Sequence, residues 1–314
     1  MWINLGRCPR LVWGRAFSVE EGVVQNLMRL PCQKHGFPGA GYVMLQNVRN
    51  QTSTFRSGTL LLVFGLPVLL LAILPLIALV GSLDPRTLTR DLASESTQQA
   101  LRLSLTTSLI SAGLVALFGT PLAWLLARKN SKGRGALNVL LQLALFVPPA
   151  VAGLGLLSAF GPNGFCSSLL RHFGIGLVGT PVAVVLAQCF VSSPYFIRSA
   201  AAGLAGIDPA LAKVLKLEGA GRWQVFRHAV APVAWPAFVI GAAMAWARSL
   251  GEFGATLIFA GNLPGRTQTL PLAVYFNLGT GMNHAVVLAS ILLMFSLLLL
   301  LLVNCYGTRK IRPV

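Results

Sequence analysis

The sequence predicts an all-α, polytopic membrane protein, and two observations lead to this fold class. Of the 314 residues, 55% are hydrophobic and only 11% are charged, whereas about 25% charged is usual for a soluble domain. The chain also contains six apolar runs long enough to cross a bilayer, which takes about 20 helical residues. We therefore exclude an ordinary soluble domain. The six predicted spans are 59–82, 103–127, 137–160, 177–197, 233–250 and 285–304.

The two ends of the chain lie outside these spans. Residues 1–57 interrupt every apolar stretch with Arg, Gly, Pro or Gln, which predicts a disordered cytoplasmic extension; a natural start at Met44 is an alternative. Residues 58–96 are predicted to hold the first span and an outer loop. No cleavable signal pattern precedes that span, so we expect it to be retained. Residues 305–314 are predicted to form a basic cytoplasmic tail.

The positive charges sort by loop, which predicts the orientation in the membrane. Nineteen of the 25 Lys and Arg residues fall in 1–57, 128–136, 198–232 and the C-terminal tail, all on one side if the spans alternate. The positive-inside rule then places both termini in the cytoplasm. Because the charges are spread over separate loops, the net charge of +17 does not predict nucleic-acid binding.

Cysteine and histidine residues show no ligand spacing. There is no CxxC pair, so neither a disulfide framework nor a metal site is predicted. Trp124 lies near a membrane end, which is typical of an aromatic belt. The residues concerned are Cys8, Cys32, Cys166, Cys189 and Cys305, and His35, His172, His228 and His284.

The third span contains a helix-breaking motif, Phe146-Val-Pro-Pro-Ala-Val-Ala-Gly-Leu-Gly155. Its two prolines and two glycines predict a bent or broken helix. Such a break can mark a substrate route in a transporter. It can equally be a packing kink at which small residues allow close helix contact, and both interpretations stay open.

The basic loop 198–232 has the pattern of two short amphipathic helices. Asp208 followed by Pro209 is a good helix start, and glycines then end the first helix. The second helix is predicted to run until Pro232. Amphipathic helices in such a loop can lie on lipid headgroups or in the groove of a partner protein. The apolar positions are Leu211, Val214 and Leu215 in the first helix, and Trp223, Phe226 and Val230 in the second.

The segment from Leu211 to Pro232 resembles the cytoplasmic loop of binding-protein-dependent ABC importer permeases. Their signature begins Glu-Ala-Ala, continues to a glycine and ends in Leu-Pro. This sequence matches at Gly219 and Pro232 but departs at the start, which is Lys213-Val214-Leu215, and at Ala229 and Ala231 near the end. The resemblance implies a type I importer transmembrane domain over 97–304, with this loop as the coupling helix in a cleft of the ATPase subunit. The implied coupling residues are Asp208, Leu211, Lys213, Val214, Leu215, Gly219, Ala220, Gly221, Trp223, Phe226 and Pro232.

The stretch from Ala247 to Pro271, which includes Gly-Glu-Phe-Gly-Ala-Thr256, resembles the molybdate permease family, with the sulfate permeases close behind. The proline motif of the third span is similar to the same family. Arg248 and Glu252 are four residues apart and can pair. They can form an ion pair at the outer membrane interface or part of an outer gate for an anion. The gate residues so implied are Pro148, Pro149, Arg248, Gly251, Glu252, Gly254 and Thr256.

The resemblance implies a transport subunit rather than an enzyme. The sequence lacks the Gly-x-x-x-x-Gly-Lys-Ser/Thr phosphate loop, so we expect ATP and Mg²⁺ to be bound by a separate ATPase subunit and no cofactor by this chain. An external substrate-binding protein is expected to deliver the anion. Since six spans make half a pathway, we expect a homodimer in the cytoplasmic (inner) membrane.

The anion and the class of transporter have alternatives. Sulfate, thiosulfate or tungstate import places demands on the pore similar to those of molybdate. A secondary transporter would need an acid or base relay inside the membrane, and a membrane enzyme would need clustered catalytic groups. The predicted spans contain neither.

Overall fold

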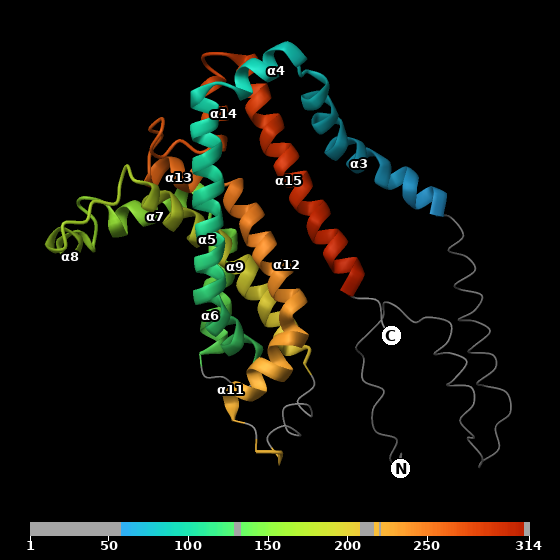
Figure 1. The fold of residues 1–314 in the computed structure, drawn as a ribbon, viewed down its shortest axis with the longest axis vertical. Helices are drawn as coiled ribbons and strands as arrows, with labels where there is room; N and C mark the ends of the chain where they lie inside the picture. Colours follow the sequence, from blue (N-terminus) through green and yellow to red (C-terminus); the bar gives the residue numbers. More distant parts are fainter. Residues whose placement is uncertain (1–57, 129–132, 208–216, 220, 311–314) are drawn as a thin grey trace, which may run out of the picture. The chain divides into compact units, whose positions relative to one another are not determined.

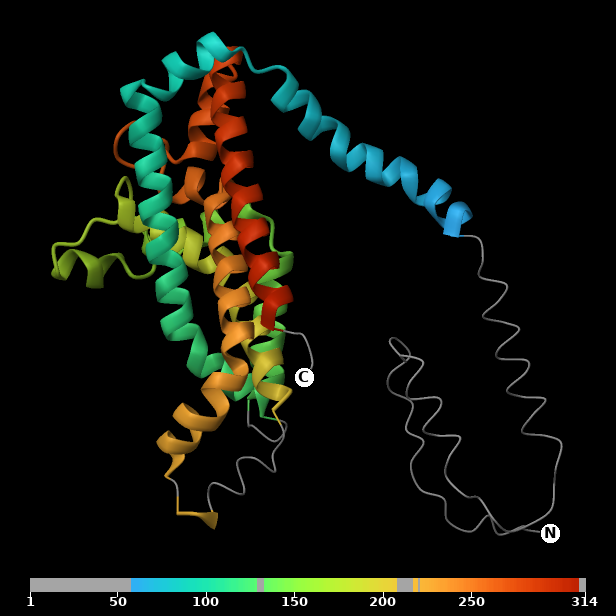
Figure 2. The same ribbon diagram turned by 45° about the vertical axis from the view of Figure 1, so that its right-hand side comes forward.

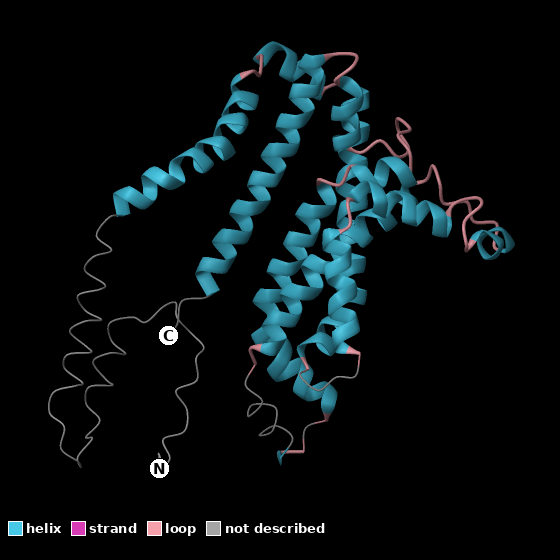
Figure 3. Cartoon of the chain, turned by 180° about the vertical axis from the view of Figure 1, so that it is seen from behind, coloured by secondary structure: helices cyan, strands magenta, loops and turns pink. Residues whose placement is uncertain are grey.

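The computed structural model describes residues 58–128, 133–207, 217–219 and 221–310. All regular structure in these ranges is helical (Figure 1, Figure 3). The contacts divide the chain into two units, 1–70 and 71–314, and each is described by itself.

The first apolar span is the helix α3 (Gly58–Gly81), whose first half belongs to the first unit. Pro67 and Pro75 lie within this helix and do not end it. Its side chains from Phe64 to Ala78 are exposed and almost all apolar. An apolar helix with exposed side chains suits contact with lipid.

In the second unit, four single helices and one bent pair are long and apolar enough to cross a membrane. The bent pair turns through 115° at Val147 and Pro148, so the predicted break in the third span is confirmed. With α3, the described residues provide five spans, or six if the bent pair is one span. The helices are α5 (Glu95–Ala127), α6 (Arg134–Phe146) with α7 (Pro149–Phe160), α9 (Pro181–Ala205), α12 (Ala231–Leu250) and α15 (Met282–Lys310).

The segment predicted as an outer loop before the second span contains a short helix, α4 (Pro85–Leu92). The next helix, α5, begins at Glu95, where the Ser94 hydroxyl accepts a hydrogen bond from the Thr97 N–H. Hydropathy detects only the part of a helix that lies in lipid. The first two turns of α5 are polar and capped, so they extend the helix beyond the apolar run.

The helices α5, α9 and α12 lie side by side and form the main core (Figure 2). Polar side chains tie them together at buried positions: the Ser111 hydroxyl donates to Gln188 Oε1 at 3.0 Å, and the Trp246 indole donates to the Ser108 hydroxyl at 3.0 Å. Buried hydrogen bonds between helices are worth about 1 kcal/mol each. They fix the register of α5 against both neighbours.

Two ends of this unit are named by what they carry. The loop end carries the described residues 206–207, 217–219 and 221–230, and the α4 end carries α4, α14 (Leu270–Asn277) and the start of α15 (Figure 1). At the α4 end, His284 Nδ1 lies 3.1 Å from Asp91 Oδ2, and the Leu270 N–H donates to Ser104 Oγ at 2.7 Å. Between the ends, α7 and the short α8 (Ser167–His172) project sideways beside α13 (Gly254–Phe259) (Figure 1, Figure 2).

Candidate functional site

The structure brings together two sequence motifs, the helix-breaking motif of the third span and the 247–271 stretch. The start of α7, after the helix break, packs directly against α13, which follows α12. A Cβ added to Gly153 would lie 2.8 Å from the Ala255 carbonyl oxygen, and one added to Gly254 would lie 3.0 Å from Pro149 Cβ. The glycines therefore permit a backbone contact that a side chain would prevent.

This contact predicts a large difference between two glycines of one helix. Gly153→Val should destabilise the packing of α7 on α13 by about 1–3 kcal/mol, because its neighbours are backbone atoms that cannot rotate away. Gly155 has nothing within 4 Å of the added Cβ, so Gly155→Val is the matched control. Thermal unfolding of the purified variants checks this; equal melting temperatures would contradict the packing role of Gly153.

Arg248 and Glu252 form an ion pair at the end of α12. Arg248 Nη1 lies 2.8 Å from Glu252 Oε2, and the Glu252 side chain is fully buried. Glu252 lies beyond Gly251, the residue that ends α12, and its Oε1 accepts the Ala255 N–H at 2.8 Å. The buried carboxylate argues against the alternative of a solvent-facing pair at the membrane surface. A role in gating stays a prediction.

Buried hydroxyl groups are found on α9, α12 and α13. Ser249 follows Arg248 in α12, Thr256 lies in α13, and Ser192 lies in α9; their hydroxyls have no hydrogen-bond partner among the described residues. A buried hydroxyl without a partner costs free energy.

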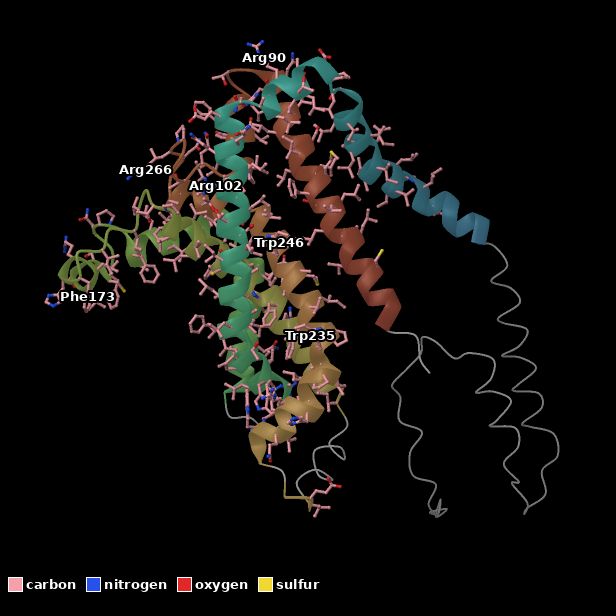
Figure 4. All side chains as sticks on the ribbon, viewed as in Figure 1. Arg90, Arg102, Phe173, Trp235, Trp246 and Arg266 are labelled. Carbon is pink, nitrogen blue, oxygen red and sulfur yellow. The ribbon has the colours of Figure 1, made fainter. Side chains whose placement is uncertain are left out.

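Exposed arginines are found toward the α4 end. Figure 4 labels Arg90 on α4, Arg102 on α5 and Arg266 between α13 and α14, and all three are exposed. Trp246 and Trp235 both lie on α12, with Trp235 nearer the loop end (Figure 4). These arginines share the α4 end with the acidic residues Asp84, Asp91 and Glu95.

At the loop end, the glycines of the predicted coupling loop have defined roles. Gly219 has φ of +85°, a left-handed conformation that glycine adopts without strain. The Gly221 N–H donates to Gln224 Oε1 at 2.8 Å, which caps the start of α11 (Arg222–Val225). The residues Asp208, Leu211, Lys213, Val214, Leu215 and Ala220 lie outside the described residues.

The expectation that Pro232 stops the second loop helix is wrong. The chain continues from α11 through a π-helical segment, η1 (Phe226–Val230), directly into α12. The Ala231 N–H donates to the Phe226 carbonyl in the i to i+5 pattern. Pro232 stands in the first turn of α12, where a missing N–H is tolerated. Widened π turns occur often at functional sites.

Sequence reasoning missed the aromatic contact that joins this loop to α5. The Phe226 ring packs edge-on against Trp124 at 5.5 Å between centroids, and Trp223 stacks on Phe226 at 5.5 Å. Arg128 lies over the Trp124 ring at 5.1 Å. Trp124 thus contacts the loop, and the aromatic-belt interpretation misses this role. The i, i+4 spacing of Trp124 and Arg128 indicates their own contact but not the contact with Phe226.

Comparison with known proteins identifies the family. Residues 119–309, more than half of the chain, match the family described as the binding-protein-dependent transport system inner membrane component. The chain belongs to this family. The permease is thus a multi-pass membrane protein and a transport component, and the loop end and the α12–α13 region both lie within the matched residues.

Named relatives of the permease cover most of it. The molybdenum transport system permease protein ModB of Mycobacterium tuberculosis is 40% identical over 230 residues, 73% of this chain and 86% of that protein. The probable transport system permease protein NifC of Clostridium pasteurianum is 35% identical over 233 residues, 74% and 82% of the two chains. The sulfate transport system permease protein CysT of Escherichia coli is 35% identical over 216 residues, 68% and 78%.

Solved structures support the fold of the permease. A bacterial alginate ABC transporter in complex with an alginate pentasaccharide-bound periplasmic protein contains a chain that matches with a TM-score of 0.64 at 16% identity. That match covers 85% of the permease and 98% of the other chain. At this identity the likeness concerns the fold, which is that of an ABC transporter permease.

Proposed function

We propose that this permease is the membrane-spanning subunit of an ATP-driven importer that carries molybdate across the inner membrane. The observation that supports it best is the 40% identity to a named molybdenum transport permease over 86% of that protein. Within the 247–271 segment, α13 packs against α7, which follows the helix break of the third span. This arrangement suits a gate built from two motifs of the same family.

The proposed mechanism divides the permease into a docking region and a path. The exposed Trp223 ring is available to an ATPase subunit, whereas Phe226 and the buried Val225 and Val230 pack on the bundle. A movement imposed on α11 therefore reaches the end of α5 through the Phe226–Trp124 contact. ATP binding and hydrolysis in the partner would switch the two permeases of a homodimer between inward and outward openings.

The path needs weak attraction for the anion. In this proposal, exposed arginines at the α4 end receive the anion from an external binding protein, and Arg248 attracts it further. Glu252 lies 2.8 Å from Arg248 and offsets most of that charge, so the anion is not held tightly. The loop end, which holds Arg134, Arg198 and Arg227, then faces the cytoplasm, together with both termini.

Sulfate is the second candidate, because the sulfate permease of Escherichia coli is 35% identical over 216 residues. Uptake of labelled molybdate and labelled sulfate by vesicles that contain the permease, its ATPase and its binding protein separates the two. We expect saturable molybdate uptake that a tenfold excess of unlabelled sulfate over saturating molybdate lowers by less than about twofold. This result corresponds to a preference for molybdate of about tenfold or more, or above about 1.4 kcal/mol. Preferential sulfate uptake would overturn the assignment of the anion.

A further inference from the structure

A basic pocket lies at the loop end, beside the packed cluster that includes Trp124 and Phe226. It encloses about 450 Å³ where the ends of α5, α6 and α9 meet. Its polar side chains are Arg134 and Asn138 on α6 and Arg198 on α9. The remaining lining is apolar and small: Leu126, Gly135, Ala201, Ala202 and Ala205.

The pocket exists because one face of α9 carries alanines. Arg198, Ala201, Ala202 and Ala205 follow the i, i+3, i+4, i+7 spacing, so they share the face that meets α6. Methyl groups do not fill the space that longer side chains would close. The buried Leu126 of α5 lines the pocket beside them.

Among the described residues, the charge of the pocket has no acidic partner. No acidic side chain in this part of the chain lines it, and neither Arg134 nor Arg198 makes an ion pair there. Arg134 also begins α6, whose N-cap Gly133 offers no side-chain cap, so free backbone N–H groups at this helix start add to the positive potential. Two guanidinium groups, an amide and a helix start favour one ligand chemistry, a tetrahedral oxyanion group.

We propose that this pocket binds a phosphate-type oxyanion at the loop end, between α6 and α9. The headgroup phosphate of an anionic phospholipid and a free oxyanion share this chemistry. The volume is larger than a bare tetrahedral anion needs and suits a headgroup with its glycerol. Basic pockets between membrane helices on the cytoplasmic side commonly hold such headgroups. The bilayer leaflet that supplies such a lipid depends on the membrane orientation proposed above. The binding of an oxyanion in the pocket does not depend on it.

Binding by the full chain in nanodiscs tests the site without any transport assay. One arm counts phosphatidylglycerol molecules retained from a mixture with phosphatidylcholine, by native mass spectrometry. The other arm measures radiolabelled inorganic phosphate bound in phosphatidylcholine alone. Arg198→Gln or Arg134→Gln should weaken binding by about tenfold or more, because each removes charge-assisted hydrogen bonds. Arg227→Gln removes an exposed charge of η1 outside the pocket and should change binding by no more than about fivefold.

A second pair of variants separates the built pocket from diffuse positive charge. Ala202→Leu fills the pocket and keeps every charge, so we expect it to lower binding as much as Arg198→Gln does. Ala136→Leu makes the same change at an exposed position of α6 outside the pocket and should leave binding intact.

Each outcome of the two arms decides the proposal. If the pocket variants bind less phosphatidylglycerol than the wild type, the ligand is a lipid headgroup. If they bind less inorganic phosphate but retain the lipid, the ligand is a free oxyanion. Both results support the site. The proposal is overturned if neither probe binds, or if either the Arg198→Gln or the Ala202→Leu variant elutes as wild type and binds both probes as the wild type does.

Discussion

Replacing Phe226 with alanine is expected to lower anion uptake roughly tenfold or more, with ATP hydrolysis by the partner subunit continuing. Phe226 contacts Trp124 on one side and Trp223 on the other. Truncating a half-buried ring between two aromatic neighbours costs about 2 kcal/mol or more. Without this ring, movement of α11 is no longer passed to the end of α5. Anion uptake and ATP hydrolysis should be measured in the same vesicles, and the ratio of uptake to hydrolysis should fall.

Variants of the two tryptophans show which contact carries the effect. Trp124→Ala should uncouple in the same way, and the double variant with Phe226→Ala should be little worse than either single variant, because both remove the same contact. Trp223 is 69% exposed, so Trp223→Ala should mainly weaken ATPase association. If Phe226→Ala leaves the uptake-to-hydrolysis ratio unchanged, the Phe226–Trp124 contact has no coupling role.

Replacing Glu252 with alanine should destabilise the fold by about 3–5 kcal/mol, the usual cost of breaking a buried ion pair. The change leaves the Arg248 charge without its partner and frees the Ala255 N–H that now bonds to Glu252 Oε1. The end of α12 and the start of α13 should loosen together. Thermal unfolding of the purified permease measures the loss, and a melting temperature equal to that of the wild type would contradict it.

The double variant Arg248→Met/Glu252→Met separates a structural role from a gating role. Replacing both members of a buried pair by apolar residues of similar volume is often neutral or stabilising, so the melting temperature should recover. If the pair also attracts and releases the anion, uptake should stay low although the fold is restored. Recovery of both stability and uptake would show that the pair only holds α12 and α13 together.

The membrane spans could be predicted from the sequence because the signal is local. An apolar run of bilayer length identifies a span by itself, and the two prolines after Val147 identify the break in the third span. The polar extension of α5 could not be found in this way, because its first turns depend on the Ser94 cap rather than on hydropathy. The continuation through Pro232 depends on a π turn, for which no sequence rule was available.

The candidate site was predicted only as separate motifs. Sequence spacing indicated the Arg248–Glu252 pair, but the approach of Gly153 to Ala255 joins residues about one hundred positions apart. Trp124 was missed for the same reason, because its contact with Phe226 depends on how the loop folds back against α5. Contacts between distant segments depend on tertiary packing, which periodicity along one element does not encode.

The dependence of uptake on ATP tests the central proposal most directly. Labelled molybdate uptake should be measured in vesicles that contain the permease, its ATPase subunit and its binding protein. ATP should be supplied, or left out, on the side of the vesicle membrane where the loop end of the permease lies. We predict uptake against a gradient only with ATP and the ATPase subunit present, and its loss when residues 211–230 are deleted from a permease that still inserts. Concentrative uptake by the permease alone, driven by an ion gradient, would show a secondary transporter and contradict the proposal.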